Sequence, residues 1–286
     1  MAAAHTEPHA PVLQGLWESV RAAHEEVLLS SYLPASYGFL LHVLLSAPFL
    51  ALDALCGVSR RVRSWRIASG SGSQPSPRRW MECFRRLLCR YLTTVLPATA
   101  VIQSLRTAAL PELAPSCWQL FVEVSACLLL FDTVYFIWHL SMHRGTQVIQ
   151  YVTSIKLEGA LLSAQTKERV CWLYRNIHQL HHEHRVPFAL AAQDSSAFEL
   201  LSLLLLAQGS AWLVGCHPLS EAFFHLINSW LAVEDHCGYD LPLALHKLLP
   251  CLGGARYHQA HHNFHSGNYA PYFTHWDHLF GTYRAS

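Results

Sequence analysis

Apolar stretches recur along the chain at the length needed to cross a membrane. Residues 36–58, 91–110 and 118–140 carry few charges and are each 20 residues or longer. A helix of about 20 residues spans the roughly 30 Å hydrocarbon layer of a bilayer, so the three stretches predict three spans. Ahead of them, residues 11–33 place leucines and valines on one side of a helix, which predicts an amphipathic helix before or against the membrane.

Two shorter apolar stretches follow in the second half of the chain. Residues 198–215 and 219–233 are separated only by the sequence CHP. The break predicts a helical hairpin that dips into the membrane from the side on which it begins. His217 in the break, beside a proline, is expected to be a turn residue.

A basic segment fixes the expected orientation in the membrane. Residues 59–90 contain nine arginines around a linker rich in serine, glycine and proline. Cytoplasmic loops of membrane proteins carry an excess of arginine and lysine, so this segment is expected in the cytosol. Counting spans from there places every histidine-dense segment, at residues 139–143, 178–184, 236–246 and 258–265, on the same cytosolic side.

The composition agrees with a membrane protein. Of 286 residues, 52% are hydrophobic and 14% are charged, and the mean hydropathy is +0.19. The net charge of +1, with the arginines gathered in one segment, argues against a nucleic-acid partner. The nine cysteines form no CxxC pair and favour buried thiols. No cleavable signal peptide is recognisable, so the first span is expected to act as a signal anchor.

Histidines concentrate in three short boxes. The sequence HLSMH places His139 and His143 on one face of a helix, one turn apart. The boxes HQLHH and HQAHH, which begin at His178 and His258, repeat this spacing and each add a third histidine. One metal ion takes about four to six ligands, so the eight box histidines and two more nearby predict two metal ions. The expected ligands are His139, His143, His178, His181, His182, His236, His246, His258, His261 and His262, and the eight in the boxes are also expected to be catalytic.

Several features bear on the identity and surroundings of the metal. Imidazole binds zinc, copper, iron and nickel, so the ligand type alone leaves the metal open. The zinc-peptidase motif HExxH is absent, and few acids lie near the histidines, unlike in soluble di-iron bundles. Asp132, Glu234 and Asp235 are expected either to orient imidazole N–H groups or to cap helices and pair with arginines.

The histidine boxes also carry a family resemblance. Together with VEDHCGYDLP at residues 233–242 and APYFTHWDHLFGT at residues 270–282, they resemble the motifs of the fatty acid hydroxylase/sterol desaturase superfamily. FDTVYFIWH and WLYRNIHQLHH are most similar to the branch that hydroxylates the cholesterol side chain. The resemblance extends from about Tyr37 onward. It implies a multi-pass enzyme of the endoplasmic reticulum membrane whose histidines hold two iron ions that activate O2.

The resemblance further implies partners for the reaction. The substrate would be a sterol taken from the bilayer. The electrons would come from NADPH through a membrane reductase or a cytochrome b5-type donor, because the chain has no nucleotide-binding or haem-attachment motif of its own. A C4-sterol oxidase, a lipid desaturase of the same superfamily and a non-catalytic metal-binding membrane protein remain the alternatives.

The predicted architecture is all-α. It is a polytopic membrane helical bundle with a cytosolic, histidine-rich helical cap that holds the two metal ions. Residues 1–35 form an N-terminal segment with the amphipathic helix, residues 36–140 hold spans and the basic segment, and residues 141–286 form the catalytic region with the hairpin at 198–233. Residues 145–171 are an insertion between two histidine boxes that family members usually lack.

Overall fold

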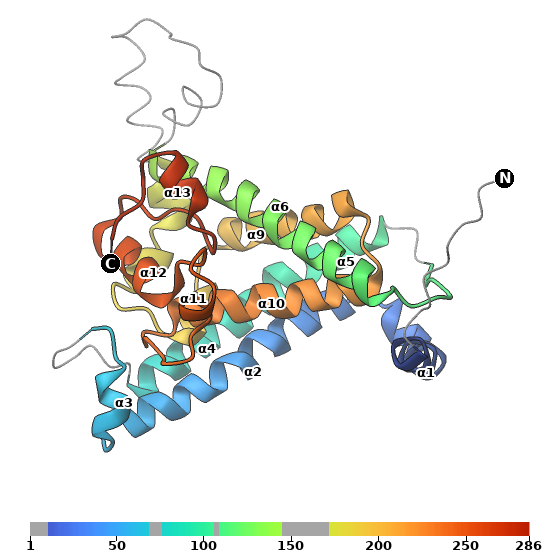
Figure 1. Cartoon of the computed structure of the whole chain (residues 1–286), viewed down its shortest axis with the longest axis horizontal. Helices are drawn as coiled ribbons and strands as arrows, with labels where there is room; N and C mark the ends of the chain where they lie inside the picture. Colours follow the sequence, from blue (N-terminus) through green and yellow to red (C-terminus); the bar gives the residue numbers. More distant parts are fainter. Residues whose placement is uncertain (1–10, 69–75, 106–108, 145–171, 286) are drawn as a thin grey trace, which may run out of the picture.

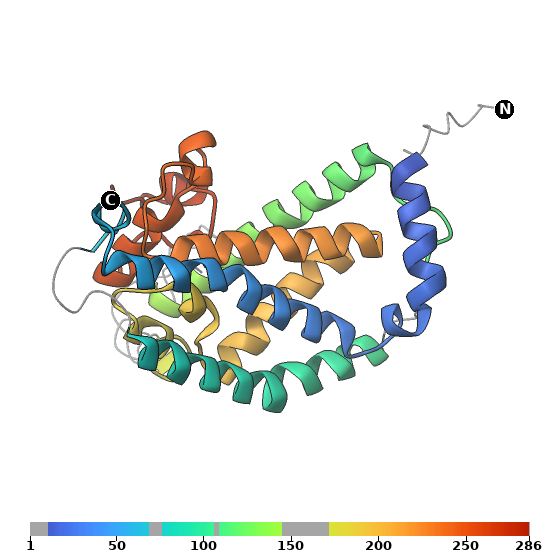
Figure 2. The ribbon, with the colours of Figure 1, turned by 90° about the horizontal axis from the view of Figure 1, so that it is seen from below.

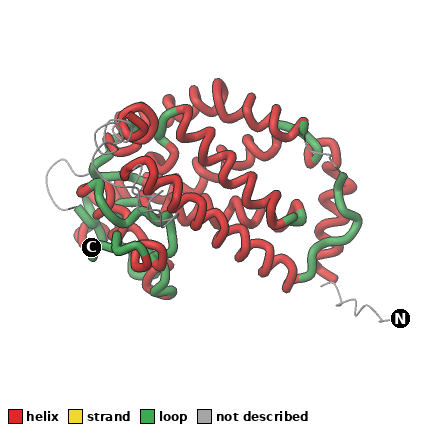
Figure 3. The backbone as a smooth tube through the Cα atoms, turned by 90° about the horizontal axis from the view of Figure 1, so that it is seen from above, coloured by secondary structure: helices red, strands yellow, loops and turns green. Residues whose placement is uncertain are grey.

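The regular elements of the protein are helical, as expected from the sequence. The computed structural model describes residues 11–68, 76–105, 109–144 and 172–285, and this part of the chain contains helices and two isolated antiparallel bridges (Figure 3). The insertion at residues 145–171 lies outside the described residues. In chain order the elements are α1 (Pro11–Leu28), α2 (Leu33–Cys56), α3 (Arg60–Ser64), α4 (Pro77–Arg90), η1 (Tyr91–Val95), α5 (Leu96–Ser104), α6 (Cys117–Arg144), η2 (Tyr174–His178), η3 (His181–Glu183), η4 (Ala189–Gln193), α9 (Ala197–Val214), α10 (Pro218–His236), α11 (Leu245–Leu248), α12 (Gly254–Phe264) and α13 (His275–Leu279).

Polar residues and one glycine set where several helices begin and end. Ser76 and Ser196 accept hydrogen bonds from the backbone N–H three residues further on and so cap α4 and α9. Gly215 ends α9 in the left-handed conformation, at φ 71°, which glycine adopts without strain. His217 then opens α10 by accepting from the N–H of Leu219. The structure thus has a helix, a tight turn and a second helix where the sequence predicts the hairpin.

Helix α10 lies at the centre of the bundle, where it packs against α2, α6, α12 and η4. The long helices extend from one end of the molecule, where α11, α12 and α13 gather, toward the other, where α1 lies (Figure 1). We call these the cap end and the α1 end. Helix α1 lies across its end of the bundle (Figure 2), where Trp17 Nε1 donates to the Pro111 carbonyl at 3.0 Å. The Trp17 ring also meets the His217 ring edge-on at 4.8 Å.

Three helices among the described residues are long and apolar enough to cross a membrane, and they indicate a multi-pass membrane protein. They are α2, α6 and α9. They coincide with the stretches at residues 36–58, 118–140 and 198–215, which the hydropathy pattern marks as apolar segments. Their length of 18 to 28 residues fits the thickness of a bilayer.

Two other expected membrane segments are not among these three helices. From residue 91 the chain stays helical to Ser104, but the whole run consists of α4, the π-helical turn η1 and the short α5, none of which is long enough by itself to be among the three. Helix α10 contains the acids Glu221, Glu234 and Asp235, which reduce its apolar character. Its central position lets it bury these acids against other helices.

Part of the basic segment is bound to the cap end of the bundle. Arg66 pairs with Asp53 of α2 at 2.9 Å, and both side chains are 4% exposed. The hydroxyl of Tyr239 donates to the same carboxylate at 2.6 Å. Arg86 forms an ion pair with Asp194, in the loop before α9. The arginines therefore hold the segment in place as well as supplying positive charge.

Candidate metal centre

Nine of the ten expected ligands lie together at the cap end in two groups. In each group, one possible ligand atom of every residue lies within 4.8 Å of all the others. The five-histidine group consists of His139, His143, His178, His182 and His261. The four-histidine group consists of His181, His236, His258 and His262. All nine side chains are buried except that of His143, which is partly exposed.

Each HxxHH box contributes to both groups. On α12, His258 and His262 are one turn apart and belong to the four-histidine group, whereas His261 points to the five-histidine group. In the other box, His178 and His182 belong to the five-histidine group and His181 to the four-histidine group. Its backbone is not a regular α-helix, because η2 is a π-helical turn and η3 a 3-10 turn. Such irregular turns are frequent at functional sites.

The imidazoles of both groups meet through their Nε2 atoms. In the five-histidine group the Nε2–Nε2 distances are 2.9 Å for His139–His178, 2.9 Å for His178–His182, 3.2 Å for His143–His182 and 3.2 Å for His182–His261. In the four-histidine group they are 3.1 Å for His181–His236, 3.0 Å for His236–His258 and 3.1 Å for His258–His262. Two nitrogens at right angles around an ion, with bonds of about 2.1 Å, lie about 3.0 Å apart. The observed separations fit such a donor set.

Hydrogen bonds on the opposite nitrogens settle which atoms can bind a cation. His139 Nδ1 donates to the carbonyl of Tyr269 at 2.7 Å, and His261 Nδ1 donates to the carbonyl of Gly267 at 2.8 Å. Because a carbonyl oxygen only accepts, each Nδ1 carries the proton, and the neutral ring has a lone pair on Nε2. In these two rings the Nε2 lone pair therefore faces the neighbouring imidazoles and carries no proton. A metal cation is the partner that suits them.

A carboxylate and a third carbonyl complete this outer support. His178 Nδ1 donates to Glu199 Oε1 at 2.8 Å, and His236 Nδ1 donates to the carbonyl of Ala232 at 2.8 Å. Such bonds fix the tautomer and orientation of a metal-binding imidazole. The role of Glu199 was not anticipated from the sequence. The available signal is its place as the acid in the first turn of α9, directly after the box segment.

The acids expected to orient the imidazoles have other partners. Asp132 Oδ1 accepts from the backbone N–H groups of Tyr272 and Phe273, both at 3.0 Å. Glu234 Oε1 accepts from the N–H of Leu245 at 2.9 Å. Asp235 lines the cavity described below. The orienting role is therefore wrong for Asp132 and Glu234, which bind backbone N–H groups in the manner of caps.

His246 lies apart from both groups, against the first residue of α12. Its Nε2 is 3.3 Å from Asp240 Oδ1, and Asp240 also pairs with Lys247 and Arg256, each at 2.7 Å. A Cβ on Gly254, at φ +70°, would fall 2.2 Å from the His246 ring. The structure thus corrects the expectation that His246 joins the other imidazoles. The reason is the strong ion-pair cluster around Asp240, which the histidine spacing does not reveal.

The environment keeps the grouped imidazoles neutral. Burial lowers the pKa of His181, His258 and His262 well below the usual value, because a buried imidazolium is poorly solvated, and neighbouring imidazoles lower these pKa values further. Neutral imidazole is the form that binds metal. The site is therefore ready to accept a cation at neutral pH without first losing protons.

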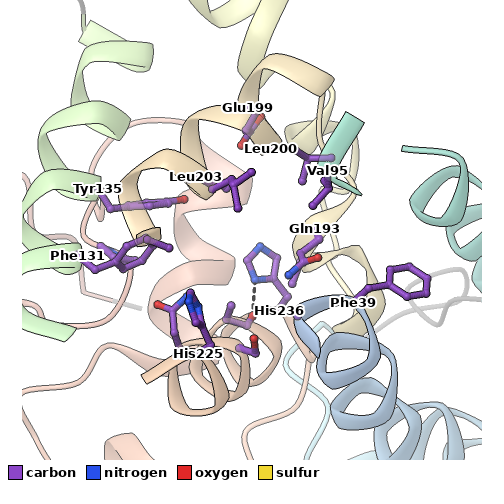
Figure 4. A pocket seen from close by; sticks show the side chains of 18 of the residues that line it. Phe39, Val95, Phe131, Tyr135, Gln193, Glu199, Leu200, Leu203, His225 and His236 are labelled. Atoms are coloured by element: carbon purple, nitrogen blue, oxygen red, sulfur yellow. Dashed lines mark hydrogen bonds between the residues drawn. The ribbon is translucent and has the colours of Figure 1, made fainter. Parts of the chain in front are cut away.

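A largely apolar cavity begins at the four-histidine group and extends toward the α1 end. His181, His236 and His258 line it at the cap end. Its walls come mainly from α2, α6, α9 and α10, and Figure 4 shows Phe131 and Tyr135 of α6 and Leu203 of α9 on it. A cavity with apolar walls and a few polar groups is typical of a binding site for an apolar molecule.

Known proteins share these features of the sequence. Residues 124–282 match the family model described as fatty acid hydroxylase. A cholesterol 25-hydroxylase-like protein of Danio rerio is 36% identical, with 94% of this chain and 97% of that protein covered. A cholesterol 25-hydroxylase of Rattus norvegicus is 37% identical, with 96% of this chain and 84% of that protein covered.

A more distant relative and the solved structures complete the comparison. A methylsterol monooxygenase of Aspergillus fumigatus is 26% identical, with 98% of this chain and 86% of that protein covered. No solved structure matches the chain significantly. The family model covers more than half of the chain, and relatives above 30% identity cover nearly all of it. The chain therefore belongs to the fatty acid hydroxylase family.

Proposed function

We propose that the protein is a membrane sterol hydroxylase that uses O2 and two iron ions to hydroxylate the side chain of cholesterol, giving 25-hydroxycholesterol. The observation that carries this proposal is the convergence of nine imidazoles through Nε2 in two adjacent groups, one of which lines an apolar cavity. The relatives named cholesterol 25-hydroxylase support the choice of substrate and product.

In this proposal the two histidine groups are the ligand sets of the two ions. His139, His143, His178, His182 and His261 hold one ion, and His181, His236, His258 and His262 hold the other. His246 is left out. Bound iron supplies the oxidising power toward an inert C–H bond that protein side chains lack. Iron is preferred over the other metals that imidazole binds because the chain belongs to a family of hydroxylases.

The reaction needs electrons from outside the chain. One oxygen atom of O2 enters a C–H bond to give C–OH, and the other leaves as water, which consumes two electrons and two protons. NADPH supplies the electrons through a membrane reductase or a cytochrome b5-type donor. The protein itself binds the substrate in the cavity, excludes water with apolar walls such as Phe131 and Leu203, and holds the imidazole rings in place through Glu199 and the carbonyls.

We also propose the location of the protein, in the membrane of the endoplasmic reticulum with its cap end in the cytosol. Arg60, Arg61 and Arg63 lie exposed on α3, beside the cap, and arginines favour the cytosolic side of a membrane. The sterol would enter the cavity from the bilayer. The electron donor would reach the cap from the cytosol.

The test combines metal analysis with product analysis on the full chain in lipid nanodiscs. Iron is measured per chain, and the protein is then supplied with cholesterol, NADPH, a reductase system and 18O2. The expected result is two iron ions per chain and 25-hydroxycholesterol that carries one 18O atom. The control is the double variant His182→Ala/His258→Ala, with one residue removed from each group, which should form no product.

Other outcomes would support the alternatives. Oxidation at the C4 position of the ring, which the name of the Aspergillus fumigatus relative suggests, would make the protein a C4-sterol oxidase. A new double bond would make it a desaturase. Tightly bound zinc without O2 consumption would make it a metal-binding membrane protein without catalysis. Each of these results would refute the proposed reaction.

A further inference from the structure

A polar cluster lies on the cavity wall at a distance from the metal-binding groups. Gln208 Nε2 of α9 donates to His225 Nε2 of α10 at 3.0 Å, and Gln208 Oε1 accepts from Gln103 Nε2 of α5 at 3.2 Å. Gln208 is only 2% exposed, although α9 is otherwise apolar enough to span a membrane. Burying such an amide is costly, and polar residues inside membrane helices commonly mark functional sites.

The hydrogen bonds in this cluster leave two donors available on the cavity. Because Gln208 donates to Nε2 of His225, the proton of the neutral ring lies on Nδ1, which has no partner in the described part of the chain. Glu221 Oε1 is 3.9 Å from the same Nε2, beyond hydrogen-bond distance. One turn along α10, the Tyr272 hydroxyl lies 2.9 Å from Asn228 Oδ1 and 3.0 Å from the Asn228 backbone carbonyl, and the amide N–H groups of Asn228 donate to no other described residue.

The cluster and the metal-binding end share one face of α10. His225, Asn228, Ala232 and His236 follow one another at intervals of three or four residues, and all four line the cavity. Figure 4 shows His225 and His236 on this same cavity. Eleven positions of helix separate these two histidines, which is about 16 Å along the axis. A sterol has about this length from its ring hydroxyl to the end of its side chain.

We propose that His225 and Asn228 bind the ring hydroxyl of the sterol, with Gln208 holding the His225 ring in the donating tautomer. The inference rests on the proposed function, and it assigns the direction in which the sterol lies. The side chain then ends at the four-histidine group, with the apolar rings of the sterol beside Phe131 and Leu203. Position C4, next to the hydroxyl-bearing carbon, lies at the far end. The cavity thereby selects the side chain over C4.

This direction also answers a physical problem of the membrane setting. A sterol whose side chain faces the cap end carries its hydroxyl toward the interior of the helical bundle, where a hydroxyl without a partner is costly. The donors on His225 and Asn228 supply that partner. A sterol in the opposite direction would leave both donors facing hydrocarbon.

The test compares cholesterol with cholest-5-ene, which lacks the hydroxyl, by equilibrium binding of each radiolabelled sterol to the full chain in nanodiscs. The wild type is expected to bind cholesterol roughly tenfold more tightly, the size of one buried hydrogen bond. His225→Phe and Asn228→Leu should each reduce this preference, and the double variant should bind the two sterols equally. The control is Ser210→Ala, which removes a hydroxyl bonded within α9 at Leu206 and should keep the preference.

Equal binding of the two sterols by the wild type would overturn the inference, and this comparison needs no variant to fold. A preference that survives in the double variant His225→Phe/Asn228→Leu would also overturn it. Sterol binding with this preference, but no hydroxysterol, would refute the proposed function and keep the hydroxyl site. Side-chain hydroxylation without the preference would keep the function and refute the site. Oxidation at C4 would overturn the assigned direction.

Discussion

The two histidine groups differ in what surrounds them. No member of the five-histidine group lines the cavity, whereas His181, His236 and His258 of the four-histidine group do. The outer nitrogens of both groups are only partly supported, and the two groups differ in the kind of partner. In the five-histidine group, two Nδ1 atoms donate to carbonyls and a third to Glu199. In the four-histidine group, Nδ1 of His236 donates to the Ala232 carbonyl and Nδ1 of His181 lies 3.3 Å from the Ser195 hydroxyl. Nδ1 of His258 and of His262, like Nδ1 of His182 in the five-histidine group, has no hydrogen-bond partner in the described residues.

The difference in cavity contact means that the two proposed ions differ in how the substrate can reach them. In the five-histidine group, five donors that do not line the cavity would hold one ion, so a substrate in the cavity has no direct access to it. Four donors on the cavity wall hold the other, and a metal site with fewer protein ligands keeps room for exchangeable ligands. The substrate would therefore meet the pair from the four-histidine side.

The largest effect is expected from removing one ligand of either group. His182 Nε2 contacts three other imidazoles of its group, and His258 Nε2 contacts two of its own. His182→Ala and His258→Ala should each lower the iron content from two ions to about one and reduce turnover by more than about 100-fold. Metal analysis and product formation on each variant provide the check. Loss of both ions in each variant would show that the groups form one inseparable site.

A smaller effect is expected at the outer support, and it should differ between the groups. Glu199→Gln keeps the shape of the side chain but replaces the carboxyl group that accepts from His178 Nδ1 with an amide, and should reduce turnover by about 10- to 100-fold. Ser195→Ala removes a hydroxyl that lies 3.3 Å from His181 Nδ1 and also interacts with Glu199, and it should cost less than about tenfold. Steady-state rates with iron content measured in parallel decide the order. A larger loss in Ser195→Ala would show that the Ser195 hydroxyl contributes more to turnover than the Glu199 carboxyl group does.

Much of the site was predictable from spacing alone. Pairs at i and i+4 share a helix face whatever the tertiary structure, so the partnership of His139 with His143 followed from the sequence. The division of each HxxHH box between two groups did not, because it depends on how η2, η3 and α12 are turned toward each other. The contact of Glu199 with His178 likewise depends on the tertiary structure. The carbonyl acceptors were missed for a further reason. Backbone acceptors leave no trace in the pattern of residue types.

The fold, too, was only partly predictable, because features that depend on packing do not appear in the sequence pattern. Hydropathy located α2, α6 and α9, because long apolar runs allow few alternatives in a membrane. It did not show that the helical run which begins this segment contains the π-helical turn η1, because nothing in the composition marks such a turn. It also treated the C-terminal part of the hairpin as a simple apolar segment. The acids of α10 are buried because that helix is central, which only the packing reveals.

Acid should affect metal binding only weakly down to about pH 6. Burial lowers the pKa of His181, His258 and His262 well below the usual 6.5, so these rings stay neutral at that pH. Iron content should be unchanged between about pH 7.5 and pH 6 and fall only at lower pH. Metal analysis after equilibration at each pH is the measurement. A loss centred at pH 6.5 would mean that the imidazoles of the four-histidine group behave as solvent-exposed groups.

The same shifts determine how acid acts on the metal-free protein. Because the folded-state pKa of each ring lies below its unfolded value, the unfolded chain binds more protons below about pH 6.5. The stability of the metal-free protein should therefore be fully present above that pH and decrease as the pH falls through it. Thermal unfolding in detergent across this range shows the sign. A rise in stability on acidification would contradict the burial of the rings.

The smallest effect should come from changing His246, the predicted ligand that lies outside both groups. His246 contacts Asp240, whose carboxylate is also bound by Lys247 and Arg256, so His246→Ala leaves that acid paired. Iron content should stay at two ions, and the free energy of unfolding should change by less than about 1 kcal/mol, as for a partly exposed ion pair. Loss of one ion would instead add His246 to the four-histidine group. Both groups would then have five donors, and the proposed reason why the substrate meets only one of them would disappear.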